Sequence, residues 1–120
     1  MKTLDFYTGF EGHPEILILL KNKDESSFLE LKTWIGYFDS TLKKIQPNNG
    51  NWEGIALHYH METGWYDGEW ECDNLSLLYR QLLNINSVNR DSKELLFVET
   101  FIDVVLCASE NNKKLLIRYS

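Results

Sequence analysis

The pattern of apolar and polar positions predicts three short strands, two near the beginning of the chain and one at its end. Residues 4–7 form a short run before glycines and Pro14 break the chain, and residues 115–119 form the last strand. Residues 16–20 are a continuous apolar run bounded by Pro14 and a polar stretch. Such a run is typical of a strand buried on both faces, although the pattern alone leaves a short helix open.

A stripe of apolar residues spaced three and four apart predicts an amphipathic helix over residues 28–45. Ser27 and Glu30 match a capping box at its beginning, and Pro47 ends it. A helix of roughly five turns packed on a sheet fits better than a coiled coil, which needs more heptads. The stripe consists of Phe28, Leu31, Ile35, Phe38, Leu42 and Ile45.

Large apolar residues alternate with smaller or more polar ones over residues 55–61, and this pattern predicts a half-buried strand. Ile55, Leu57, Tyr59 and Met61 would lie on one face, and Ala56, His58 and His60 on the other. Two turns compete after it, one over residues 62–64 and one at Asp67-Gly68, and the second would pair Tyr66 with Glu69 in a hairpin. The sequence leaves this register open.

Two helices are predicted in the second half of the chain. Asp73 is placed to cap a helix over residues 74–83, and Asn111-Asn112 to end a longer one over residues 92–111. The longer helix is expected to be the most buried one. The apolar residues assigned to its buried face are Leu95, Leu96, Phe97, Val98, Phe101, Ile102, Val104, Val105, Leu106 and Cys107.

Taken together, the elements follow the order strand-strand-helix-strand-strand-helix-helix-strand. With 120 residues, the chain has the length of one domain. We therefore expect a single α+β or α/β domain over residues 1–120, with a mixed β-sheet packed against about three helices.

Charge and composition narrow the range of functions. The chain has 12 basic and 18 acidic residues and a net charge of −6, which argues against nucleic acid and against an anionic membrane as partners. No apolar run is long enough to span a bilayer, and residues 1–6 show no secretion signal, so we expect a cytoplasmic protein. The cysteines at positions 72 and 107 are expected to be reduced.

Candidate chemistry is sparse. His58 and His60 would share one strand face and could hold a metal ion if Cys72 or Glu53 supplied a further ligand. The simpler interpretation is a polar outer face of a strand, because no zinc motif accompanies the pair. The acids on either side of Cys72 disfavour its thiolate, which makes it a poor nucleophile. We therefore expect no cofactor, no resident metal ion and no catalytic residue.

The most distinctive segment is the acidic window, which we define as residues 62–73. It contains five acids and no Lys or Arg, so its charge of −5 is most of the net −6. Alternation along a strand would place Trp70 on the face opposite Glu69 and Glu71. The acids could protect an edge strand, or the segment could be a protein-binding surface with aromatic anchors. The candidate partner-binding residues are Glu62, Trp65, Tyr66, Asp67, Glu69, Trp70, Glu71 and Asp73.

A second, thinner acidic surface is predicted near the first helix. It would combine Asp24 and Glu25 with Glu11 and Glu15.

Two phrases carry a family resemblance. One is Gly-Trp-Tyr-Asp-Gly-Glu-Trp at residues 64–70, followed by a leucine-rich helix, and the other is the terminal helix with residues 109–120. With its size and acidity, the chain resembles bacterial immunity proteins of contact-dependent growth inhibition and of wider polymorphic-toxin systems. Barstar is a similar acidic inhibitor, but shares too few residues to indicate kinship.

The resemblance implies a cytoplasmic protein, not an enzyme, that binds the C-terminal domain of its cognate toxin and blocks it by stoichiometric occlusion. A basic nuclease is the expected toxin, with the acids of the window mimicking phosphates. The protein would be a monomer or a small homo-oligomer. Two alternatives remain: a small metal-binding protein or enzyme that uses His58 and His60, and an adaptor subunit with a neutral partner.

Overall fold

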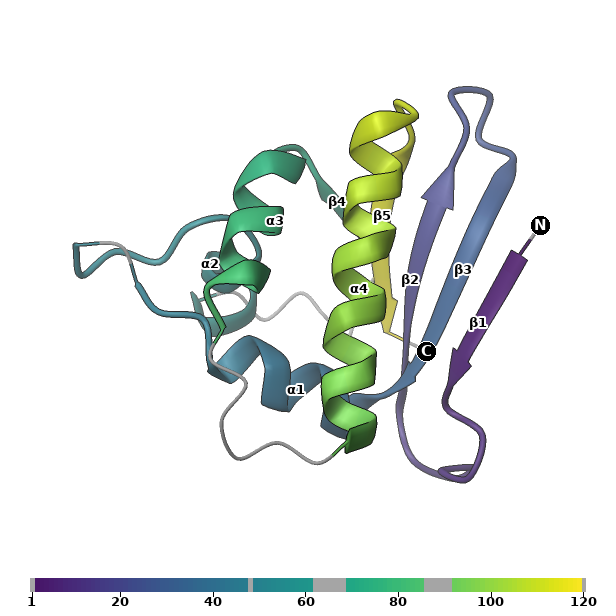
Figure 1. Cartoon of the computed structure of the whole chain (residues 1–120), viewed down its shortest axis with the longest axis horizontal. Coiled ribbons are helices and arrows are strands. Elements are labelled where there is room, and N and C mark those ends of the chain that lie inside the picture. Colours follow the sequence, from purple (N-terminus) through teal and green to yellow (C-terminus); the bar gives the residue numbers. More distant parts are fainter. Residues whose placement is uncertain (1, 48, 62–68, 86–91, 120) are drawn as a thin grey trace.

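The structure is a computed structural model that describes residues 2–47, 49–61, 69–85 and 92–119. In this part of the chain, five strands form one mixed sheet in the order β1-β3-β2-β5-β4 (Figure 1). β1 runs parallel to β3, and all other neighbours are antiparallel. The strands are β1 (Lys2–Phe6), β2 (Glu15–Lys21), β3 (Ser27–Trp34), β4 (Glu69–Cys72) and β5 (Lys114–Tyr119).

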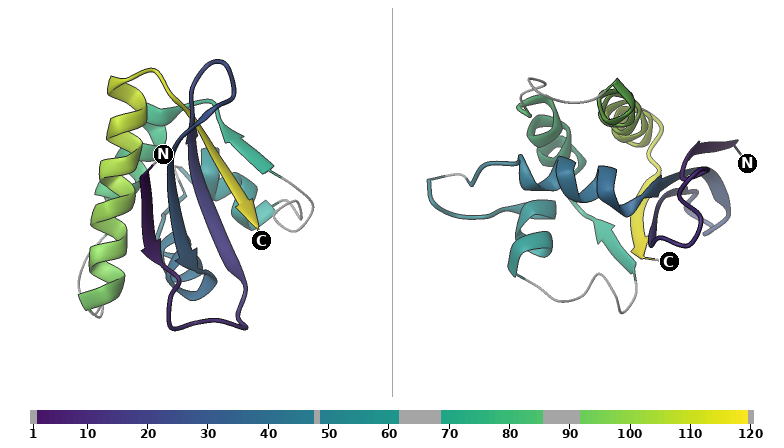
Figure 2. Two further views of the ribbon diagram at one scale, coloured as in Figure 1. Left: turned by 90° about the vertical axis from the view of Figure 1, so that its right-hand side faces the viewer. Right: turned by 90° about the horizontal axis from the view of Figure 1, so that it is seen from below.

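Helices pack on one face of this sheet. The long helix α4 (Ser92–Glu110) lies beside α3 (Leu75–Leu83), and α1 (Ile35–Lys43) continues directly from β3 (Figures 1 and 2). Helix α2 (Gly54–Met61) contacts α1 and α3 at the side of the molecule away from β1. The predicted fold class is confirmed: the chain forms a single α+β domain with a mixed sheet.

The core lies between the sheet and the helices. The register places Ile18 of β2 opposite Leu31 of β3 and Ile117 of β5, and all three side chains are fully buried. Phe97 and Phe101 of α4 cover this face and are equally buried. The apolar residues of these central strands and of α4 therefore supply most of the hydrophobic stabilisation.

The other face of the sheet carries a smaller apolar cluster. Leu17, Leu19 and Leu116 are only 7–9% exposed there. Lys32 and Arg118 lie opposite Leu17 in the register, and long charged side chains cover leucines with their aliphatic stems. The prediction that residues 16–20 form a strand buried on both faces is thus confirmed.

The strands predicted at the two ends of the chain and the two helices of its second half are also confirmed, within one or two residues. The cap of α3 differs by one position, because Asn74, and not Asp73, accepts a hydrogen bond from the backbone N–H of Leu77 at 3.0 Å. Asn112 follows α4 with a positive φ of 54°, as predicted for an asparagine that ends a helix.

The helix predicted over residues 28–45 is wrong in its first half, which forms β3. In this strand Leu29, Leu31 and Thr33 are buried while their neighbours are more exposed, a period of two that pairing with β1 and β2 on both sides maintains. Helix α1 begins only at Ile35. A Cβ at Gly36 would collide with the indole ring of Trp34, so glycine lets the chain pass from strand to helix beneath that ring.

The strand predicted over residues 55–61 is also wrong, because this segment forms α2. Ile55 and Ala56 are adjacent in sequence, and both are buried, which one face of a strand does not allow. Tyr59, four residues after Ile55, packs partly against the same core, whereas Leu57 is 41% exposed. Burial therefore follows a helical period, which the short alternation in the sequence did not reveal.

Candidate functional site

The described part of the acidic window forms β4 and the residue after it, at the edge of the sheet beyond β5. Glu69 and Glu71 are exposed, while Trp70 packs partly against the core and Cys72 is buried. The predicted alternation along this strand is therefore confirmed. Four candidate residues, Glu62, Trp65, Tyr66 and Asp67, lie outside the described residues, as does the Asp67-Gly68 turn.

The acids of β4 differ in their partners. Glu69 lies opposite Arg118 of β5 and forms an ion pair with it, in which Arg118 Nε donates to Glu69 Oε2 at 2.9 Å. Glu71 lies opposite Leu116, and neither Glu71 nor the exposed Asp73 forms an ion pair with another described residue. Within the described part of the window, these two carboxylates have the negative charge that is most available to a partner.

Cys72 is a free cysteine, as is Cys107, in agreement with the expected reduced thiols. Burial raises the pKa of the Cys72 thiol, and the charges of Asp73 and Glu71 act in the same direction, against a hydrogen bond from the backbone of Asn74. The thiol is therefore protonated near neutral pH. This supports the interpretation of Cys72 as a poor nucleophile and identifies burial as the main cause.

The element predicted to carry the histidine pair differs in the structure. His58 and His60 lie on helix α2 and not on a strand, so the shared strand face predicted for them is wrong. Among the residues whose side chains the structure describes, which do not include those two histidines, no group of three or more His, Cys, Asp or Glu residues is arranged to hold a metal ion.

The second predicted acidic surface is wrong, because its members lie at opposite ends of β2. Glu15 pairs with Trp34 at the beginning of the strand, whereas Asp24 and Glu25 belong to the turn that follows its end. Glu25 is further neutralised by Lys114, whose Nζ lies 2.6 Å from Glu25 Oε1. The separation follows from the hairpin of β2 and β3, which replaces the expected helix.

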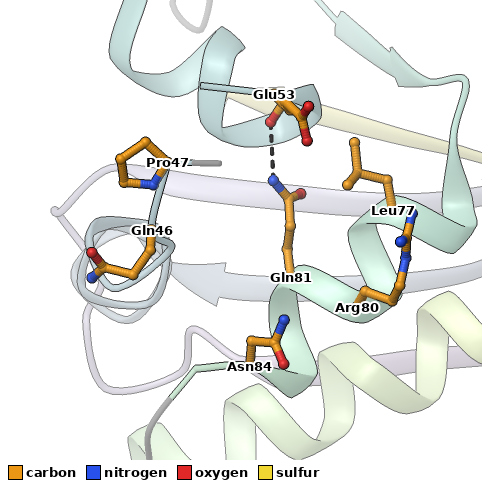
Figure 3. A pocket seen from close by; sticks show the side chains of 7 residues that line it. All are labelled: Gln46, Pro47, Glu53, Leu77, Arg80, Gln81 and Asn84. Atoms are coloured by element: carbon orange, nitrogen blue, oxygen red, sulfur yellow. Dashed lines mark hydrogen bonds between the residues drawn. The ribbon is translucent and has the colours of Figure 1, made fainter. Parts of the chain in front are cut away.

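A polar pocket of about 520 Å³ lies between the end of α1, the beginning of α2 and the side of α3 (Figure 3). In Figure 3 the side chain of Gln81 reaches from α3 towards α2, where its Nε2 donates to the backbone oxygen of Glu53 at 3.0 Å. Its Oε1 is buried and has no hydrogen-bond donor among the described residues. The described lining consists of Gln46, Pro47, Glu53, Leu77, Arg80, Gln81 and Asn84.

This pocket does not support a catalytic interpretation. Its described lining contains no His, Cys, Ser or Thr side chain, so it offers no familiar nucleophile or imidazole base. The buried Oε1 of Gln81 has almost no accessible surface, and a ligand in the open pocket would not reach it without rearrangement. The pocket is therefore a polar depression between three helices.

A further acidic surface, which the sequence analysis did not predict, lies on the outer side of α4. We define the α4 stripe as Leu96, Glu99, Asp103, Leu106 and Glu110. All five residues are exposed, with Leu96 at 53% and Leu106 at 38%. The assignment of both leucines to the buried face of this helix is therefore wrong. The stripe residues are three and four positions apart, which indicates a separate face of the helix. The apolar residues between them led to the interpretation that the helix is buried on most sides.

No helix in the described part of the chain is both long and apolar enough to cross a membrane. Comparisons of the chain with models of known protein families, with curated proteins and with solved structures give no significant match.

Proposed function

We propose that this domain is an immunity protein, which binds a basic toxin domain and neutralises it by covering its surface. The observation that carries the proposal is the position of Glu71 and Asp73 on and beside an edge strand. Both are exposed and without an ion pair to any other described residue. Carboxylates in such a position are free to meet Lys and Arg side chains of a partner.

The overall charge supports a basic partner. The net charge of −6 creates a negative field that accelerates encounter with a positive surface and orients it. Enzymes that act on nucleic acids carry such surfaces, because they bind phosphates. We therefore propose a nuclease domain as the partner, with the acids of the window in the place of phosphates.

The proposed mechanism is stoichiometric occlusion and involves no chemical step. Glu71 and Asp73 would pair with basic residues of the toxin, while Glu69, already paired with Arg118, would contribute less. Charge pairs at the rim of an interface act mainly on the association rate and are screened by salt. The affinity should therefore fall as ionic strength rises.

Co-expression with the product of the adjacent gene tests this function. The adjacent product alone should arrest growth, and this chain should restore growth and be recovered in a complex with it. Failure to form a complex, or a complex that does not restore growth, would contradict the proposal.

The contribution of β4 is tested by reversing its two available charges. We expect Glu71→Lys with Asp73→Lys to weaken the complex several-fold or more, because two attractive contacts become repulsive. The control, Glu11→Lys with Glu30→Lys, makes the same change in net charge away from β4, in a loop and on β3. Equal affinities of the two variants would show that β4 is not the binding surface.

A further inference from the structure

The α4 stripe runs in a straight line along the side of the helix opposite the core. Its members are spaced three, four, three and four residues apart, so they span roughly 21 Å at 1.5 Å per residue. In the left view of Figure 2, α4 forms one border of the molecule, and no described helix or strand covers its outer side.

The structure shows no stabilising role for the charges of the stripe within α4. Glu99, Asp103 and Glu110 form no ion pair with any other described residue. Glu110 is the last residue of the helix, and the last turn contains no basic residue. A negative charge at this end is unfavourable, because the helix dipole favours cations there.

A hollow with an apolar wall and a polar rim lies at the beginning of the stripe. It has a volume of about 220 Å³ and is located between the end of β1, the loop after it and α4. Its apolar lining consists of Phe6, Phe10, Tyr37 and Leu96, which also belongs to the stripe, and its polar lining consists of Asp5, Thr8 and Lys93. Stacking of Phe10 on Trp34, with ring centroids 4.3 Å apart, holds one wall of the hollow in place.

From this combination we infer that the α4 stripe and its hollow form the docking surface for a basic amphipathic helix of a partner protein. An apolar side chain of that helix would enter the hollow beside Leu96, and a second would pack on Leu106. Its Lys and Arg side chains would lie opposite Glu99, Asp103 and Glu110. Charge complementarity identifies the occupant, because the stripe consists of leucines and three carboxylates, which outnumber the one cation, Lys93, in the described lining of the hollow.

This inference rests on the proposed function for the basic character of the partner, but it names a different surface. Glu69 and Glu71 lie on the face of the sheet that is turned away from α4, since Trp70 and Cys72 of the same strand point to the core. A partner that covers β4 would therefore leave the α4 stripe free for a separate contact.

A labelled synthetic peptide tests the docking surface directly. The probe is a fluorescein-labelled peptide of leucine and lysine with its leucines on one helical face, and the control has the same composition with the order scrambled. Fluorescence anisotropy should show that the chain binds the amphipathic peptide more tightly than the scrambled one. Equal binding of the two peptides would overturn the inference, since a net attraction between opposite charges would then explain both.

Variants of the stripe locate the binding site. We expect both Leu96→Ser with Leu106→Ser and Glu99→Lys with Asp103→Lys to weaken peptide binding at least about tenfold. The control, Glu15→Lys with Glu30→Lys, reverses two charges on the opposite face of the sheet and should retain most of the affinity. Circular dichroism checks that each variant is folded. Stripe variants that bind as tightly as the unchanged chain, or no more weakly than the control, would contradict the assignment.

The same stripe variants separate this inference from the proposed function. If the unchanged chain restores growth and the stripe variants bind the amphipathic peptide as tightly as the unchanged chain, the docking inference fails while the immunity function stands. If the unchanged chain does not restore growth but the peptide binds through the stripe, the immunity function fails while the docking surface stands.

Discussion

The two faces of α4 differ sharply in burial, although both carry large apolar residues. On the inner face Phe97, Phe101 and Val105 are fully buried, whereas on the outer face Leu96 is 53% and Leu106 is 38% exposed. The difference arises because the sheet, α1 and α3 all pack on the same side of the helix. A leucine on a helix thus contributes hydrophobic burial only where another element packs on it.

Loss of a ring from the inner face should have the largest effect. We expect Phe101→Ala to lower the free energy of unfolding by about 3–5 kcal/mol, because it leaves a cavity beside Phe97, whose ring centroid lies 5.8 Å from that of Phe101. Equilibrium unfolding in urea, followed by circular dichroism, measures the change. A loss below about 1 kcal/mol would mean that the core relaxes around this site, or that α4 is not packed as described.

The inner face also contains one buried charge, which provides a second and smaller test. Glu94 is 8% exposed and forms an ion pair with Lys44 of the α1 end, with Lys44 Nζ and Glu94 Oε1 2.8 Å apart. We expect Lys44→Met to cost about 1–3 kcal/mol, since it removes a partner of a buried carboxylate, although solvent partly screens the lysine. Lys43→Met, at the exposed neighbouring position, is the matched control in the same urea experiment. Equal stabilities of the two variants would show that the ion pair contributes nothing.

Truncation on the outer face should have the smallest effect. We expect Leu106→Ala to change the free energy of unfolding by less than about 1 kcal/mol, because its side chain is already in contact with water. Comparison with Phe101→Ala in the same buffer then gives the contrast between the two faces. A loss as large as that expected for the core would indicate that Leu106 is covered in solution, for example by a second copy of the chain.

Part of the fold was predictable because the local pattern of some segments favours one arrangement. Residues 16–20 are apolar at every position, and this fits a central strand buried on both faces. Helix α3 begins close to its predicted cap and helix α4 has a long apolar pattern, so both were found with nearly correct bounds. The two helical patterns contain enough local information to determine the element, whereas the run at residues 16–20 favours a strand and leaves a short helix open.

The two wrong elements share a different cause. Residues 27–34 contain apolar positions that fit both a helical and a strand period, and the helical interpretation extended the stripe of α1 backwards into β3. Residues 54–61 are too short for periodicity to separate a strand from a helix. For residues 27–34, pairing with β1 and β2 favoured a strand over a helix. For residues 54–61, packing against other helices favoured a helix over a strand.

The candidate site, like the fold, was predictable from the sequence only in part. The alternation that exposes Glu69 and Glu71 is visible in the sequence, and so is the concentration of acids. The pairing of Glu69 with Arg118 depends on the register between two strands that are 49 positions apart at this point. The available charge of Glu71 and Asp73 could therefore be recognised only after β4 was placed beside β5.

By itself, the sequence determined the acidity of the chain, its size as one domain of helices and a mixed sheet, and the long apolar helix α4, and it favoured the central strand β2. The tertiary structure alone decided that residues 27–34 form a strand, that residues 54–61 form a helix, and that the α4 stripe faces outwards. The reason is physical: composition and local period are properties of neighbouring residues. Burial and ion pairing, in contrast, depend on which distant surface comes to lie against a side chain.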